Sequence, residues 1–145
     1  MTARVLVVTD QLQASPDLFD AVRTRADRDR CAFRYVVTNP ARAEFHLVHA
    51  ERHEAVTHAE AALQDLVLQL TQQTGCEVTG EVSIRHDPFE AAEEEHLHRP
   101  VDEVIIAVHE HRVAQRLHHD LATRLAHLGL PVTVVTSRTS APSGL

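Results

Sequence analysis

The chain has 145 residues, a formal net charge of −7 and an isoelectric point near 5.9, with 43% hydrophobic and 24% charged residues. This composition is typical of a globular domain long enough to bury a core, and it excludes wholesale disorder. All 14 basic side chains are scattered arginines, so no nucleic-acid partner is expected. No apolar run approaches the roughly 18 residues of a membrane span, and no leader-like segment precedes the first strand, so we expect a cytoplasmic protein without a membrane partner.

The amino-terminal half predicts two strand–helix units. Residues 4–10 form a continuous apolar run, which is typical of a strand buried on both faces of a parallel sheet. Ser15 then supplies a helix N-cap before Pro16, and residues 31–38 form a second strand. Residues 41–49 show no clear period, and a long helix follows from about Ala50 to Thr74.

The carboxyl-terminal half predicts three more strands. Residues 76–84 alternate apolar and polar side chains around Gly80, which is typical of a sheet edge. Asp87 caps a short helix whose inward stripe is Phe89, Ala92 and either His96 or Leu97. Residues 101–108 form a uniformly apolar strand, residues 113–128 a last helix, and residues 131–136 a fifth strand. Residues 137–145 form a flexible tail behind a single domain of residues 1–136.

This alternation predicts a Rossmann-like three-layer α/β/α sandwich with a five-stranded parallel sheet. The first and fourth strands are the most apolar and should be central neighbours, while the third should be an edge. The order 3-2-1-4-5 satisfies both conditions. The order 2-1-3-4-5 ranks second, because it would bury the polar face of the third strand.

The order 3-2-1-4-5 also predicts where a ligand would bind. The strand order reverses between strands one and four, so a crevice opens beside their carboxyl ends. The residues expected there are Asp10 and Gln11 after the first strand, Thr38 after the second, and the run after the fourth, which contains His109, Glu110, His111, Arg112 and Arg116.

Several short motifs resemble the universal stress protein family. They are the opening run 5–10, the helix start Asp87-Pro88-Phe89-Glu90-Ala91-Ala92, the strand 102–106 and the closing run 130–135. The resemblance spans nearly the whole chain and implies a nucleotide-hydrolase-type sheet and a homodimer paired through the last strand. An unpaired edge recruits another chain in any case, so Val132 and Val134 are the candidate dimer residues.

The nucleotide-binding branch of that family carries a glycine-rich motif after strand four, whose backbone N–H groups approach phosphates. This chain has no glycine between Gly80 and Gly129, and two histidines with Glu110 occupy the corresponding place. The resemblance carries over only Asp10, the acidic residue after strand one. Binding of ATP or AMP is therefore disfavoured, with Arg112 and Arg116 as substitute phosphate contacts if it occurs.

A divalent-metal site is a second alternative. His109 and His111, with Asp10, Glu110 and His118, are the ligand types that Zn, Ni or Cu prefer. The chain contains 12 histidines, however, and His-x-His also occurs at His96 and His98, so composition alone produces such pairs. Solvated or hydrogen-bonded loop histidines are the favoured interpretation.

Catalysis would need a nucleophile beside an oriented base. The candidates are Thr9, Ser15, Cys31 and Cys76, and none lies in a recognisable catalytic motif. Cys31 and Cys76 both begin strands expected to be neighbours, so their Cα atoms approach bonding range, although two reduced, half-buried thiols are favoured. The sequence thus favours a non-enzymatic binding or interaction protein that forms a homodimer.

Overall fold

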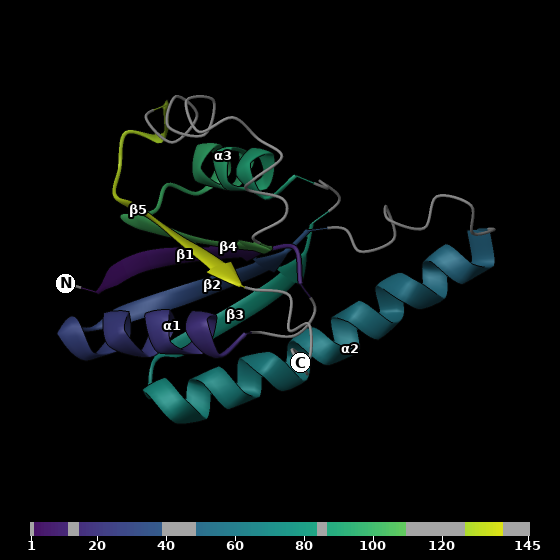
Figure 1. The fold of residues 1–145 in the computed structure, drawn as a ribbon, viewed down its shortest axis with the longest axis horizontal. Coiled ribbons are helices and arrows are strands. Elements are labelled where there is room, and N and C mark those ends of the chain that lie inside the picture. The colour runs from purple at the N-terminus through teal and green to yellow at the C-terminus, as the bar shows by residue number, and fades with distance from the viewer. Residues whose placement is uncertain (1, 12–14, 39–48, 84–86, 110–126, 138–145) are drawn as a thin grey trace, which may run out of the picture.

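The computed structural model describes residues 2–11, 15–38, 49–83, 87–109 and 127–137. They contain a parallel five-stranded sheet in the order β3-β2-β1-β4-β5 (Figure 1), which confirms the predicted strand order and the central place of the first and fourth strands. The strands are β1 (Ala3–Thr9), β2 (Cys31–Val37), β3 (Glu77–Val82), β4 (Glu103–His109) and β5 (Val132–Ser137). The helices are α1 (Pro16–Arg28), α2 (His49–Thr74) and α3 (Pro88–His98).

The helices begin where the sequence predicts. Ser15 is the N-cap of α1, and its hydroxyl accepts the Leu18 N–H at 3.2 Å. Asp87 caps α3 in the same way by accepting the Phe89 N–H at 2.9 Å. Helix α2 ends at Thr74, and Gly75 follows it with a φ of +69°, the left-handed conformation that glycine adopts readily after a helix end.

Helices cover both faces of the sheet, with α1 and α2 on one side and α3 on the other (Figure 1). Successive strand residues point to opposite faces, so the sheet feeds two separate cores. The core under α1 and α2 contains Val5, Val7, Phe33, Tyr35 and Ile105 among others. The core under α3 contains Leu6, Val8, Val36, Val104, Ile106, Phe89 and Ala92.

One residue predicted for the core under the short third helix is exposed in the structure. Leu97 is 80% exposed, so it does not belong to the inward stripe of α3, whose buried residues end at Ala92. The reason is that α3 packs on β1 and β4 only with its first turns. His96 instead stays half-buried and accepts the Val101 N–H on Nδ1 at 3.2 Å, which helps to turn the chain into β4.

Helix α2 is the longest element and packs on the edge strand β3. Its 26 residues make it roughly 39 Å long, whereas a seven-residue strand spans roughly 23 Å. The amino-terminal end of α2 therefore extends past the sheet in Figure 1. In the described part of the chain, no helix combines the length and apolar character that crossing a bilayer requires.

Candidate functional site

The structure places the switch point of the sheet between β1 and β4, where the sequence predicts a crevice. β1 pairs with β4 so that Thr9 lies opposite Ala107, and the chain reaches β4 from the far edge strand β3 through α3. Helix α1, which follows β1, covers one face of the sheet, while α3, which precedes β4, covers the other (Figure 1). The strand order therefore reverses between β1 and β4, whose carboxyl ends lie side by side at this switch point, as in other doubly wound sheets.

Thr9, Asp10 and Gln11 form a short polar turn at this end of β1. Thr9 is 1% exposed, and its hydroxyl accepts the Gln11 N–H at 3.2 Å, which bends the chain directly after the strand. Asp10 is half-buried, with its Oδ1 atom shielded from solvent. The turn therefore holds one carboxylate and one amide side chain at the carboxyl edge of the sheet.

Thr38 belongs to the same cluster, although it follows the neighbouring strand. Its backbone N–H donates to the Thr9 carbonyl at 2.9 Å, and its hydroxyl donates to the same oxygen at 3.4 Å. The side chain is only 3% exposed. The structure thus joins Thr38 to Thr9 directly, and the predicted residues Asp10, Gln11 and Thr38 lie at one sheet edge.

The predicted residues after the fourth strand lie mostly outside the described part of the chain. His109 is the last residue of β4, opposite Ser137 of β5, and it follows Ala107 by two positions, so it extends past the level of Thr9. Its side chain is not among those described. Glu110, His111, Arg112 and Arg116, with His118 of the metal hypothesis, lie outside the described residues.

Metal ligation by His109 and His111 therefore stays a prediction. Within the ranges that the structure describes, no three His, Cys, Asp or Glu side chains gather in a way that could hold a metal ion.

The structure gives Ser15 and Thr9, two of the candidate nucleophiles, a structural role, and it buries a third, Cys31. The Ser15 hydroxyl serves as the helix cap, and Thr9 holds the turn at Gln11. Cys31 is buried, and this burial, with a smaller contribution from the neighbouring Cys76, raises the pKa of its thiol to about 11. A thiol with so high a pKa is mostly protonated near neutral pH, which is the opposite of an activated nucleophile.

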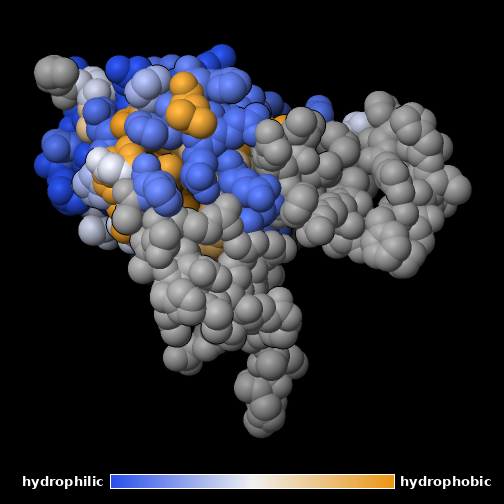
Figure 2. Space-filling model, turned by 90° about the horizontal axis from the view of Figure 1, so that it is seen from above, coloured by the Kyte–Doolittle hydropathy of each residue, from blue (hydrophilic) through white to orange (hydrophobic). Residues whose placement is uncertain are grey.

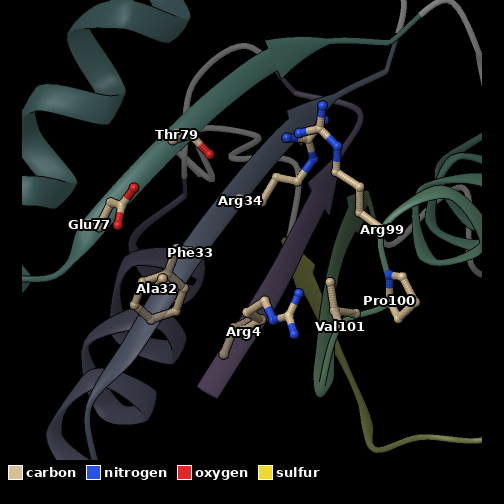
Figure 3. A pocket seen from close by; sticks show the side chains of 10 residues that line it. Arg4, Ala32, Phe33, Arg34, Glu77, Thr79, Arg99, Pro100 and Val101 are labelled. Atoms are coloured by element: carbon tan, nitrogen blue, oxygen red, sulfur yellow. The ribbon is translucent and has the colours of Figure 1, made fainter. Parts of the chain in front are cut away.

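A second feature, which the sequence analysis missed, is a groove at the amino ends of the strands on the α3 face. Its cavity of about 180 Å³ is lined by Arg4 on β1, Arg34 on β2, Thr79 on β3 and Arg99 after α3 (Figure 3). Since α3 packs on β1 and β4, the outer strands β2 and β3 keep this face open. The alternation of Arg34 with the apolar residues of its strand was the available signal.

The charges in this groove largely cancel. Arg34 Nε donates to Glu95 Oε2 at 3.0 Å, and its Nη2 pairs with Glu81. Burial, together with the nearby Glu81, raises the pKa of Glu95, whereas hydrogen bonding from Glu95 and the charge of Arg34 lower the pKa of Glu81. Arg34 is thus already neutralised, and the described surface on the α3 side is largely hydrophilic (Figure 2).

A further cavity of about 320 Å³ lies between α1 and the strands β4 and β5. Its wall includes Asp17, Asp20, Arg25 and Glu103. Arg25 is held there by Glu103 at 2.8 Å and by Asp29 at 2.6 Å. The contact with Glu103 fastens α1 to β4, whereas Asp29 is the C-cap of α1 itself, so Arg25 and Glu103 serve the packing of the fold.

No protein-family model matches the chain, and no curated protein matches it significantly. Among solved structures, it is similar to the crystal structure of a hypothetical protein, PH0823. The TM-score is 0.61 and the sequence identity is 16%, with 97% of this chain and 99% of that chain covered. At this identity the likeness shows the fold alone, an α/β sandwich around a parallel sheet in the order 3-2-1-4-5.

Proposed function

We propose that the chain is a non-enzymatic binding protein of the universal-stress type, which holds a small ligand in the crevice at the carboxyl ends of β1 and β4 and works as a homodimer. The observation that supports this proposal is the position of Thr9 and Asp10 at the carboxyl end of β1, beside β4 at the switch point, with Thr38 hydrogen-bonded to Thr9 from the neighbouring strand β2. Open α/β sheets bind their ligands at that point, because the diverging connections leave a crevice there.

The chemistry of these residues suits recognition rather than turnover. Asp10 and Gln11 offer hydrogen-bond acceptors and an amide donor, and the Thr38 hydroxyl keeps acceptor capacity after donating to Thr9. The hydroxyls of Thr9 and Thr38 are fixed by backbone contacts, which orients them without activating them.

An adenine nucleotide is the first alternative ligand. Asp10 stands where universal stress proteins carry an acidic residue after strand one, and Arg112 with Arg116 would replace the missing glycine-rich contacts to phosphate. The absence of glycine between Gly80 and Gly129 and the negative charge of Glu110 count against it. A divalent metal held by His109 and His111 is the second alternative, since imidazoles are common Zn and Ni ligands.

Thermal unfolding in the presence of ATP, AMP, ZnCl₂ and NiCl₂ tests these ligands. A ligand at 100 times its Kd stabilises the native state by about 2.7 kcal/mol, which raises Tm by several degrees. The variants are Asp10→Asn for the crevice, Arg112→Ala with Arg116→Ala for phosphate, and His109→Ala with His111→Ala for metal. Asp65→Asn is the matched control, because Asp65 is exposed on α2 away from the crevice.

Each outcome selects one interpretation. A Tm rise with ATP or AMP that Asp10→Asn and the arginine variants remove supports the nucleotide alternative. A rise with Zn or Ni alone that the histidine variants remove supports the metal alternative. No response to any of the four, together with a stable dimer, favours a pure interaction protein. If the ligand-induced rise in Tm is as large in Asp10→Asn as in the control Asp65→Asn, the ligand binds elsewhere. That result would overturn the crevice proposal.

A further inference from the structure

The two cysteines of the chain meet at the start of neighbouring strands. Cys31 is the first residue of β2, and Cys76 directly precedes β3. The parallel register begins by pairing Ala32 with Glu77, and continuing it one position earlier places Cys31 opposite Cys76. Neighbouring strands are roughly 4.8 Å apart, which falls within the Cα separation of roughly 4.4–6.8 Å that a disulfide spans.

Both side chains point to the same face of the sheet. Cys31 belongs to the core under α1 and α2, and Cys76 packs against that core. Their proximity agrees with the raised pKa of Cys31, to which the neighbouring Cys76 contributes after burial. Directly opposed residues whose side chains share one face of a sheet bring their Cβ atoms near one another, as a disulfide requires.

The two thiols differ in access to solvent. Cys31 is only 2% exposed, whereas Cys76 is half-buried, with its Sγ atom 3.7 Å from the Thr74 carbonyl at the end of α2. A small oxidant therefore reaches Cys76 first, and Cys31 lies behind it within the core.

From this placement we propose that Cys31 and Cys76 are a redox modification site, which hydrogen peroxide converts into a reversible intrachain disulfide joining β2 to β3. The Cys76 sulfur attacks one peroxide oxygen, the O–O bond breaks, and the products are Cys76 sulfenic acid and water. The Cys31 sulfur then attacks the Cys76 sulfur, and the S–O bond breaks. The departing hydroxide takes the Cys31 proton as a second water. The sum is two thiols and one peroxide giving one disulfide and two waters, and a dithiol reductant reverses it.

The disulfide would join β3, the edge strand, to its neighbour β2. In the described structure β3 pairs with β2 alone and carries α2 on one face, so the edge strand and the end of α2 open together more readily than the central strands. A disulfide closes the long segment between Cys31 and Cys76 and restricts this opening. Oxidation should therefore slow amide hydrogen exchange in β3 and in the last turns of α2, and raise Tm by about 5–10 °C.

The test oxidises the native protein with one equivalent of hydrogen peroxide and then alkylates it in denaturant with iodoacetamide. We expect an intrachain peptide pair containing Cys31 and Cys76, a monomeric band under non-reducing conditions, and two alkylated cysteines again after dithiothreitol. Two alkylated cysteines in the oxidised sample would overturn the proposal, as would a bond between two chains as the main product. These measurements use the unaltered chain and do not depend on any variant being stable.

Single variants test the order of the two steps. In Cys31→Ser the half-buried Cys76 should still be oxidised, and dimedone should trap it as sulfenic acid because its partner is gone. In Cys76→Ser the buried Cys31 should react at least tenfold more slowly with peroxide. Neither variant should show the oxidation-dependent rise in Tm. Equal peroxide reactivity of the two variants would contradict the assignment of Cys76 as the first site of attack.

Discussion

Arg25 Nε donates a hydrogen bond to Glu103 Oε1 at 2.8 Å, which joins α1 to the first residue of β4 across 78 positions of sequence. Arg25 is only 6% exposed, and it also pairs with Asp29 at 2.6 Å. The hydrogen bonds that Arg25 donates to Asp29 and Glu103 raise its pKa above the usual value, so it stays charged at any pH at which the protein folds. The buried guanidinium is tolerated because both carboxylates accept hydrogen bonds from it.

Replacing Glu103 with alanine should lower the free energy of unfolding by about 2–3 kcal/mol, because it leaves Arg25 buried with one partner. Urea unfolding measures this loss. Asp29→Ala is the matched control, and its effect should be much smaller because the Asp29 side chain is 61% exposed. The double variant Arg25→Met with Glu103→Leu should lose less than Glu103→Ala. Equal losses in Glu103→Ala and Asp29→Ala would mean that burial of the pair does not matter.

Gly80 lets α2 approach the edge strand, and its replacement by alanine should destabilise the protein by about 1–3 kcal/mol. A Cβ atom at this position would lie 2.8 Å from Val67 Cγ2 and 3.1 Å from Leu63 Cδ1. Val67 is branched at Cβ and held in a helix, so it has few alternative rotamers. This crowding outweighs the gain of roughly 0.5–1 kcal/mol that an alanine brings to a strand.

A double-mutant cycle measured by urea unfolding separates crowding from backbone effects. Gly80→Ala should cost less in a Val67→Ala background, because the shorter side chain removes the closest contact. The same cost in both backgrounds would indicate that the glycine matters for its backbone conformation instead.

The strand order can be predicted from the sequence, because the burial of a strand determines which of its residues are apolar. The polar side chains of Thr79 and Glu81 mark β3 as an edge, and the unbroken apolar runs of β1 and β4 mark the centre. The strand order then gives the switch point, at which the crevice is expected. Contacts between distant segments cannot be predicted in this way. Arg34 pairs with Glu81 and Glu95, which are 47 and 61 residues away along the chain. Only the strand register and the packing of α3 on the sheet determine these two contacts.

The hydrogen bond between Thr38 and Thr9 cannot be predicted from the sequence either. It depends on the backbone N–H of Thr38 reaching the carbonyl of Thr9, and no side-chain pattern encodes that contact. The exposure of Leu97 has a similar origin, because helical spacing marks the face of α3 but not the turn at which that helix leaves the sheet.

Tyr35 should resist ionisation until the protein unfolds in alkali. It is the single tyrosine of the chain and is fully buried, and burial raises the pKa of its phenol above the usual value of 10.0. The unfolded state loses this proton near pH 10 while the native state keeps it, so stability falls as the pH rises above 10. Absorbance at 295 nm reports Tyr35 ionisation, and it should rise together with the loss of circular dichroism. A rise in a still-folded protein would contradict the assigned burial.

Tyr35→Phe tests the hydroxyl itself. Within the described residues the Tyr35 oxygen has no hydrogen-bond partner, so removing it should leave the free energy of unfolding unchanged or increase it. The variant should also lose most of the added alkaline sensitivity above pH 10. A loss of about 1 kcal/mol at pH 7 in urea unfolding would reveal a partner for the hydroxyl.

Val134→Lys should convert the proposed dimer into a monomer. Val134 is half-buried on β5, which pairs with β4 alone in the described structure, and it shares the α3 face of the sheet with Val132. A lysine there places a charge on the edge that a second copy would cover, and charged side chains block edge-to-edge pairing.

Thr79→Lys is the matched control, because Thr79 is exposed on the opposite edge strand β3. Sedimentation over a concentration series should show a dimer for the unaltered chain and Thr79→Lys, and a monomer for Val134→Lys with unchanged circular dichroism. Dissociation by Thr79→Lys alone would move the interface to β3, and a dimeric Val134→Lys would remove β5 from it.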